Sequence, residues 1–306
     1  RAESSPSIRH IYADLDSLRD FRDALRQLHF DTVIHMLAMT RDDARAAATV
    51  FNGFTGRLIV ASSQDVYAAF GVLLKKETHS GDAPQRITES APLRSARYIR
   101  GDDYEKIDVE QVFVHECDTL PVTILRMPPT YGPEDPRSRF FPLVKRIDDG
   151  RPAILFEPSA GNFRWSHGYV ENVAHAFVLA ATRPEAANRI YNIGEARTPT
   201  QAERASAIAR AAGYRGQIVM IPLELCPASL LRDVDFRHDL VIDDAAIRTE
   251  LGYMEQVSFE EGYRRTVAWQ RTRCPVPVDL GQFDYAAEDA ALAAAGMPVG
   301  RVPGRA

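Results

Sequence analysis

Short apolar runs that alternate with helical stretches constrain the fold of this chain more than any other feature. The runs at 31–37, 56–63 and 121–128 are rich in Val, Ile and Leu. Between them, 41–54 and 103–118 have apolar residues at helical spacing. Strands that are apolar almost throughout and alternate with helices are typical of a parallel sheet covered on both faces. We therefore predict a doubly wound α/β fold.

The alternation extends to both sides of this central part. Before it, we expect a strand over 8–15 and a helix over 17–30. Beyond Pro128 the rhythm changes, and we expect strands at 152–158 and 189–194 and helices at about 138–149, 169–182, 200–212, 243–251 and 258–272. The tail from Cys274 is rich in Pro, Gly and Ala, which predicts a surface arm with at most a short helix.

Composition argues against several classes of function. The net charge of −5 includes no basic block, which argues against nucleic acid as a partner. No apolar run approaches the roughly 20 residues that span a bilayer, and there is no signal peptide, so we expect a cytoplasmic protein without a membrane partner. Cys117, Cys226 and Cys274 are widely spaced and form neither a CxxC nor a metal-binding pattern. We expect buried free thiols and no metal site.

Residues that follow the predicted strands are the first candidates for a site. Open parallel sheets bind ligands beyond the carboxyl ends of their strands. At these ends stand Asp14, Ala38 to Thr40, Ser62 to Asp65, and Pro128 to Thr130.

Six segments, in this order, resemble the extended short-chain dehydrogenase/reductase family, the NAD-dependent epimerase/dehydratase proteins. They are DTVIHMLA, IVASSQDVY, YEKIDVEQVF, LRMPPTYGPEDP, RWSHGYVENVA and YNIG, and the match runs from about residue 8 to 270. The resemblance implies a Rossmann-like fold, N-terminally truncated here, with a smaller interleaved C-terminal substrate domain. We place the dinucleotide-binding domain at 1–132 and 165–196, and the substrate domain with a C-terminal arm at 133–164 and 197–306.

The resemblance also implies a catalytic device. In this family a tyrosine acts as acid/base on a substrate hydroxyl or carbonyl, and a lysine four residues later lowers its pKa and holds the nicotinamide ribose. A serine or threonine binds the same substrate oxygen. Ser63 matches the serine, and Lys106 matches the lysine because Glu110 and Gln111 follow it. A phenol with a pKa of about 10 needs such a cation to act as a base near neutrality.

The tyrosine does not match. Asp102 stands four residues before Lys106, and no Tyr-x-x-x-Lys occurs in the chain. Tyr104 is about 200° around a regular helix from Lys106, so it reaches the site only if the first turn is irregular. Asp102 is either an N-cap, with Glu105 completing a capping box, or a catalytic or lysine-pairing group. Tyr98, in the preceding loop, is the third candidate for the vacant place.

The cofactor site is incomplete in this sequence. The family's glycine-rich turn, which holds pyrophosphate at a helix N-terminus, is absent, because nothing before Ile8 contains a glycine. The resemblance leaves Asp14 and Leu15 near the adenine of NAD or NADP, Leu37 and Ala38 along its backbone, and Ser62, Ser63 and Lys106 near the nicotinamide, with Pro128 beside them. If the truncation is real in the cell, we expect little or no dinucleotide binding.

Substrate recognition departs from the family too. Pro129 stands where many members that act on sugar nucleotides carry Asn, and Gln64 and Asp65 are further candidates for substrate contacts. Arg164 resembles a phosphate-binding arginine, although it lies one residue further from Tyr169 than usual. Paired with Arg137 or Arg139, it would grip an anionic substrate. His167 is typical of an ordinary loop histidine.

We therefore predict an NAD(P)-dependent epimerase/dehydratase or reductase that acts by hydride transfer on a small molecule, a sugar or a sugar-nucleotide-like compound. In that interpretation Ser63 holds the reacting oxygen, Lys106 binds the ribose, and Tyr104, Tyr98 or Asp102 is the acid/base. The competing hypothesis is a non-catalytic nucleotide-binding or interaction module that kept the fold and lost the dyad. The family also suggests a homodimer that pairs through the helix of Lys106 and the helix before it.

Overall fold

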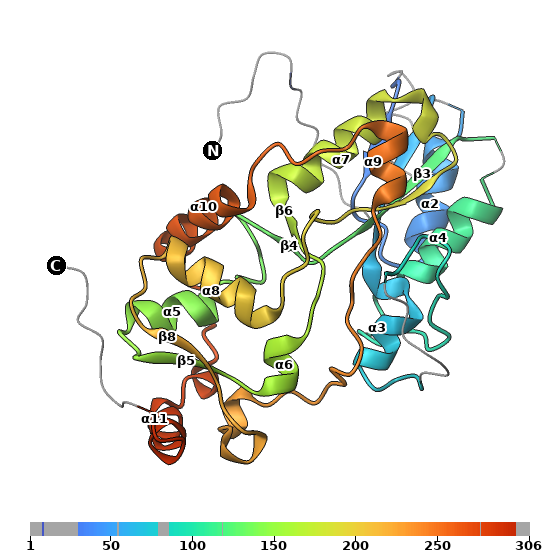
Figure 1. Ribbon diagram of the computed structural model, residues 1–306. Coiled ribbons are helices and arrows are strands. Elements are labelled where there is room, and N and C mark those ends of the chain that lie inside the picture. Colours follow the sequence, from blue (N-terminus) through green and yellow to red (C-terminus); the bar gives the residue numbers. More distant parts are fainter. Residues whose placement is uncertain are drawn as a thin grey trace.

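A four-stranded parallel sheet organises the first part of the structure, a computed structural model that describes residues 8, 30–53, 55–78, 86–117, 119–275 and 277–297. Its strands lie in the order β1 (Val33–His35), β2 (Leu58–Ser63), β3 (Val122–Met127) and β7 (Ile190–Asn192) (Figure 1). The predicted parallel α/β fold is confirmed. The strand and helix predicted over 8–15 and 17–30, together with Asp14 and Leu15, lie outside the described residues, apart from the terminal residues 8 and 30.

Helices cover both faces of this sheet. Leu58 and Val60 share one buried apolar cluster with α2 (Arg41–Phe51) and α4 (Lys106–His115). Ile59 and Ala61, which point to the opposite face, pack with α7 (Val170–Thr182) and α9 (Ala245–Leu251). Since neighbouring residues of β2 enter different cores, the strand must be apolar throughout, and this is why its sequence shows no alternation.

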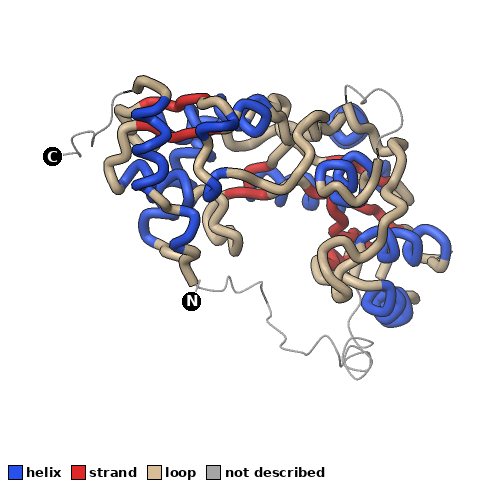
Figure 2. Tube along the Cα trace, turned by 90° about the horizontal axis from the view of Figure 1, so that it is seen from below, coloured by secondary structure: helices blue, strands red, loops and turns tan. Residues whose placement is uncertain are grey.

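A second lobe is built on the parallel pair β5 (Ala153–Phe156) and β8 (Gln217–Met220). Around it lie α5 (Phe141–Asp148), α6 (Pro158–Asn162), α8 (Gln201–Ala211) and α10 (Phe259–Thr272). The two lobes lie side by side in Figure 2, joined through the short pair β4 (Thr130–Tyr131) and β6 (Gly168–Tyr169). Where one domain ends and the other begins along the chain stays a prediction.

Three further expectations need correction or addition. Strand β8 was not predicted, because only Val219 of its four residues is buried. The tail is more than a surface arm, since Ala291 and Leu292 of α11 (Tyr285–Ala294) are buried against β5 and β8. None of the three cysteines forms a disulfide, as expected, but none is buried either: Cys117 and Cys226 are half-buried and Cys274 is exposed.

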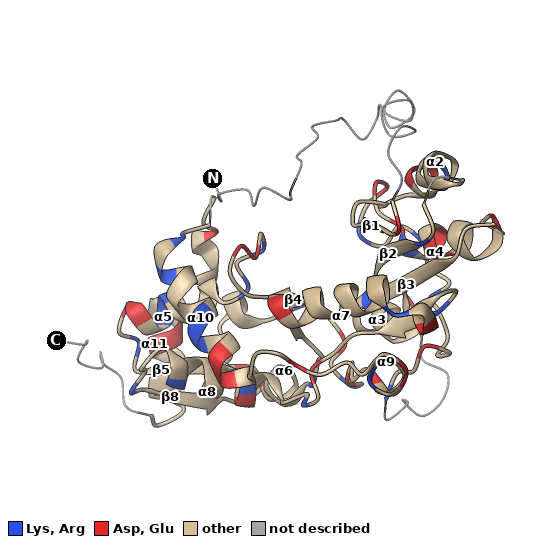
Figure 3. Cartoon of the chain, turned by 90° about the horizontal axis from the view of Figure 1, so that it is seen from above, with Lys and Arg blue, Asp and Glu red and all other residues tan. Residues whose placement is uncertain are grey.

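The described ranges contain neither a membrane-spanning helix nor a metal-binding cluster. No helix among them is long and apolar enough to cross a membrane. They contain no group of three or more His, Cys, Asp or Glu side chains that would hold a metal ion. In the cartoon of Figure 3, the positions of acidic and basic residues are interspersed over both lobes.

Candidate functional site

The helix that carries Lys106 begins at that residue, three positions later than predicted. Its N-cap is Glu105, whose backbone is extended (φ −150°) and whose carboxylate accepts a hydrogen bond from the Ile107 amide at 3.0 Å. The interpretation of Asp102 as the cap is therefore wrong, and Asp102 lies exposed in a turn. Non-local contacts determine this start: buried Arg94 donates two hydrogen bonds of 2.8 Å to Glu105, and the Glu105 amide donates to the Met39 carbonyl.

Tyr104 consequently precedes the helix, and the angular argument against it does not apply. Its hydroxyl donates a hydrogen bond to Asp65 Oδ2 at 2.9 Å and lies near enough to the Ser63 hydroxyl for that group to affect its pKa. Lys106 Nζ lies 5.8 Å from the centre of the Tyr104 ring. The structure thus brings Ser63, Tyr104 and Lys106 together at the carboxyl end of β2.

The Lys106 ammonium is buried, with 3% of the residue exposed. It donates hydrogen bonds to the carbonyl oxygens of Ala38 at 2.5 Å and Ala61 at 3.0 Å. Burial lowers its pKa to about 8, against the opposing effect of nearby carboxylates such as Asp65. An ammonium has three donors, so these two bonds leave one for a ligand.

The Tyr104 phenol is held in its protonated form. Burial raises its pKa first, and the charge of Asp65 raises it further, while the nearby Ser63 hydroxyl acts in the opposite direction. Asp65 is itself buried, with 3% exposed, and its Oδ2 also accepts a hydrogen bond of 3.1 Å from Arg100. The charge of Lys106 is therefore not the main influence on the pKa of Tyr104.

The other acid/base candidates lie elsewhere. The Tyr98 hydroxyl donates to Asp108 at 3.1 Å, and Asp108 is paired with Arg41. Nothing in the structure joins exposed Asp102 to Lys106.

The remaining residues at the strand ends have mixed roles. Ser62 is fully buried and donates to Glu110 at 2.5 Å, so its side chain does not face a ligand. Gln64 is buried and donates to the Ile193 carbonyl. Leu37 is half exposed and Ala38 buried, while Pro128 is buried and Pro129 half-buried.

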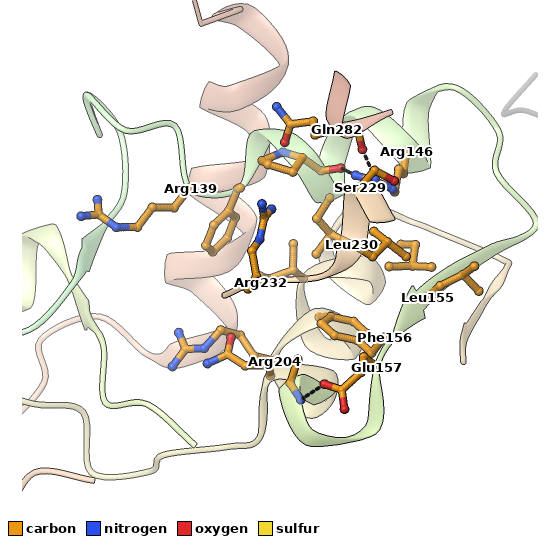
Figure 4. Close-up of a pocket in the computed structure, with 18 of the residues that line it drawn as sticks. Arg139, Arg146, Leu155, Phe156, Glu157, Arg204, Ser229, Leu230, Arg232 and Gln282 are labelled. Carbon is orange, nitrogen blue, oxygen red and sulfur yellow. Dashed lines mark hydrogen bonds between the residues drawn. The ribbon is translucent and has the colours of Figure 1, made fainter. Parts of the chain in front are cut away.

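A cavity of about 290 Å³ lies in the second lobe. Figure 4 shows Arg139 and Arg204 on one side of it, Arg232 near the middle, and Leu155 and Leu230 on the other side together with Arg146 and Glu157. The pair Arg139 and Arg204 is suited to an anionic group, and the apolar residues of the lining are suited to a hydrophobic or planar one.

Only one of the arginines predicted to grip an anion lines this cavity, namely Arg139. Arg164 instead donates to the Thr198 carbonyl at 2.8 Å and lies near Glu203, and Arg137 is exposed outside the lining. A role of Arg164 in substrate binding stays a prediction; its backbone bridges to Thr200 and its side chain lies outside this cavity.

Sequence reasoning missed Arg204, on α8. It is 4% exposed, and its Nε and Nη1 have no hydrogen-bond partner among the described residues. Its closest carboxylate oxygen, on Glu195, is 3.9 Å away. The available signal was its place on the apolar stripe of the helix, with Ala205 and Ile208, where a charged residue needs a reason.

Electrostatic interactions extend from the cavity toward Tyr104. His167 lines the cavity, and burial together with the charges of Arg204 and Arg139 holds its pKa well below its usual range, so it is neutral. The pKa of Arg139 is lowered by burial and by the neighbouring charges of Arg137 and Arg100. Arg100 also contacts Asp65, so a short series of charged groups runs from Tyr104 to the cavity.

Comparison with known proteins identifies the family. A family model described as the NAD dependent epimerase/dehydratase family matches residues 1–194. The chain belongs to this family. A dTDP-glucose 4,6-dehydratase from Streptomyces niveus is 26% identical over 254 residues, which cover 79% of this chain and 70% of that protein.

Solved structures of this family have the same fold. A dTDP-glucose 4,6-dehydratase from Bacillus anthracis in complex with NAD has a TM-score of 0.64 at 16% identity, covering 89% of this chain and 82% of that one. A UDP-glucuronic acid 4-epimerase from Bacillus cereus in complex with UDP-glucuronic acid and NAD has a TM-score of 0.63 at 16% identity, covering 88% and 83%.

The described residues fit the nicotinamide end of the family's cofactor. Lys106 keeps one donor free beside Tyr104 and Ser63, and Leu37, at the end of β1, presents an exposed apolar side chain (51%) at the edge of the site. The residues predicted for the adenine end, Asp14 and Leu15, lie outside the described ranges.

Proposed function

We propose that this chain is an NAD(P)-dependent enzyme of the epimerase/dehydratase type that oxidises and reduces a sugar nucleotide or a similar anionic sugar derivative by hydride transfer. One observation carries the proposal. Because α4 begins at Lys106, Tyr104 lies outside the helix, and its hydroxyl binds Asp65 and lies near Ser63 despite the spacing of two residues. The three functional groups that the family's chemistry requires thus meet at one place.

Each residue has a part in this chemistry. The bound nicotinamide supplies the hydride acceptor and donor. Ser63 orients the reacting oxygen of the substrate by a hydrogen bond, and Tyr104 exchanges a proton with that oxygen. Lys106 uses its remaining donor to hold a ribose hydroxyl, and the Ala38 and Ala61 carbonyls fix its direction.

The cavity supports an anionic substrate. Arg204 has two nitrogens, Nε and Nη1, without a hydrogen-bond partner among the described residues in a nearly buried guanidinium, and Arg232 adds a second positive charge, whereas the charge of Arg139 is paired with Asp135. Arginine is suited to phosphate because its planar donors bind two oxygens at once. Solved structures of the fold contain UDP-glucose or UDP-glucuronic acid together with NAD, which makes uridine and thymidine diphosphate sugars the first compounds to test.

Tyrosine substitution tests the proposal. The chain is incubated with NAD and either dTDP-glucose or UDP-glucose, and products are identified by mass spectrometry and NMR. We expect Tyr104→Phe to reduce turnover by about 10²-fold or more, since a positioned acid/base contributes about 10²–10⁴-fold. Tyr98→Phe is the matched control, because its hydroxyl contacts Asp108 and not Ser63. A loss in Tyr98→Phe with an active Tyr104→Phe would refute the assignment.

A non-catalytic module remains the second candidate, favoured by the absence of Tyr-x-x-x-Lys. Replacing Lys106 with Met separates the two functions: an enzyme should lose most of its turnover, whereas a module should bind the same sugar nucleotide with unchanged affinity. The homodimer remains a prediction, which light scattering would test.

A further inference from the structure

The carboxylate of Asp65 occupies an unusual position behind the Tyr104 hydroxyl. Its Oδ2 accepts a hydrogen bond of 2.9 Å from the Tyr104 hydroxyl, and its Oδ1 is buried with no hydrogen-bond partner among the described residues. The residue is 3% exposed, although no cation is paired with it at close range apart from Arg100 at 3.1 Å. Burying a carboxylate with one oxygen that accepts no hydrogen bond lowers stability, so its presence here calls for a functional explanation.

Among the described residues around Tyr104, the Asp65 carboxylate is the only group that can accept a proton from the phenol. Lys106 is committed to two carbonyl oxygens and lies over the ring of Tyr104, not against its oxygen. Arg100 is likewise over that ring, 5.4 Å from its centre, and Arg94 donates to the Asp65 backbone carbonyl. Ser63 is a neutral hydroxyl. None of these groups can take a proton from Tyr104 at neutral pH.

We propose that Asp65 is the proton acceptor behind Tyr104, so that the pair, and not a tyrosinate stabilised by lysine, provides the acid/base of the reaction. The proposal rests on the proposed function. Tyr104 touches the substrate, and Asp65 is a positioning residue that acts through it.

The step balances as a relay. In the oxidative half-reaction the substrate O–H bond breaks and its proton passes to the Tyr104 oxygen, while the original Tyr104 proton passes to Asp65. The adjacent C–H bond breaks with its electron pair, which passes as hydride to NAD(P), and a carbonyl forms. The product state holds a neutral Tyr104 and a neutral Asp65. The reductive half-reaction returns both protons in the reverse order.

Direct titration of Tyr104 tests the coupling without any substrate. In protein with ¹³Cζ-labelled tyrosine, Tyr104→Phe assigns the resonance. We expect wild-type Tyr104 to titrate above the usual value of about 10, and Asp65→Asn to lower its pKa by about one unit or more by removing the adjacent negative charge. Asp108→Asn is the matched control, because this buried aspartate accepts a hydrogen bond from the other tyrosine, Tyr98, at 3.1 Å. It should leave the Tyr104 resonance unchanged.

Kinetics with dTDP-glucose and NAD provide the second measurement. Asp65→Asn should lower kcat at neutral pH by about 10²-fold or more and make kcat rise tenfold per pH unit, because Tyr104 must then ionise by itself. Asp65→Glu, which retains a carboxylate, should restore a rate that changes little with pH. Circular dichroism and the urea midpoint establish that each variant is folded.

The outcomes separate the two proposals. If Asp65→Asn leaves the pKa of Tyr104 unchanged, the relay is overturned whether or not any sugar nucleotide reacts. The relay is also overturned if Asp65→Asn is active and its kcat has the same pH dependence as the wild type. If the Tyr104 pKa falls but neither dTDP-glucose nor UDP-glucose reacts with any variant, the coupling is supported and the proposed function fails.

Discussion

Glu105 holds together the start of α4, and its replacement by Gln tests how strongly a single ion pair fixes the site. The side chains of Glu105 and Arg94 are both 0% exposed and share two hydrogen bonds of 2.8 Å. Glu105 also accepts hydrogen bonds from the amides of Tyr98 at 2.7 Å and Ile107 at 3.0 Å. Glutamine has nearly the same shape, so two changes dominate: the charge of Arg94 is left buried without a counter-charge, and an NH2 group replaces an oxygen that accepts two hydrogen bonds.

Removing one partner of a buried ion pair costs about 3–5 kcal/mol, and we expect the free energy of unfolding of Glu105→Gln to fall by that amount. Urea unfolding followed by the fluorescence of Trp165 and Trp269 measures it. Adding Arg94→Met should recover part of the loss, because the uncompensated charge then disappears.

Glu116→Gln is the control for Glu105→Gln. Glu116 also binds an arginine, Arg45, through two hydrogen bonds of 2.9 and 3.0 Å, but on the surface. Solvent screens this pair, so we expect little change in stability. If Glu105→Gln loses less than about 1 kcal/mol, the pair behaves like a surface pair, and the reasoning that it fixes the start of the helix is refuted.

Two further predictions concern pH and backbone conformation. Lys106 has a pKa of about 8 in the folded chain against 10.5 for the free side chain, so burial of its charge destabilises the fold fully below pH 8 and less and less as the pH rises toward 10.5. The free energy of unfolding of the wild type, relative to that of Lys106→Met, should therefore rise by up to about 1.4 kcal/mol per pH unit in this window. Urea unfolding measures this difference, and a difference that does not change with pH would contradict the prediction. Gly132 has φ +145°, and an added Cβ would lie 2.4 Å from Val170 Cγ1, whereas a Cβ added to Gly53, at φ +89°, has no atom within 4 Å. Gly132→Ala should therefore lower the free energy of unfolding by about 1–3 kcal/mol more than Gly53→Ala does. Equal urea midpoints for the two variants would show that the steric overlap is relieved.

The fold could be predicted from the sequence because its determinants are local. Apolar runs such as 56–63 have both faces buried, and helical spacing between such runs leaves few topologies for a parallel sheet. Strand β8 was missed for the opposite reason: with one of its four residues buried, it carries almost no hydrophobic signal.

The site could be predicted only in part. Ser63 and Lys106 follow strand and helix patterns, and the structure places them together. The position of Tyr104 depends on Arg94, which is ten residues earlier and binds Glu105, and no local rule reveals that pair. GDDYEK offers several acidic residues as caps, and the tertiary contact selects the one nearest the lysine. Arg204 was missed because a charged residue in a helix is ordinarily assigned to solvent.

The placement of Tyr104 outside α4 has a consequence for how this protein would respond to stress. A tyrosine and a lysine one turn apart on a helix keep their alignment for as long as the helix persists. Here Lys106 belongs to the helix, but Tyr104 is aligned by side-chain contacts of the 94–105 loop. Local opening of such a loop requires less free energy than global unfolding. Warming should therefore abolish activity over a lower temperature range than that in which the helical signal in circular dichroism disappears, and cooling from that range should restore it.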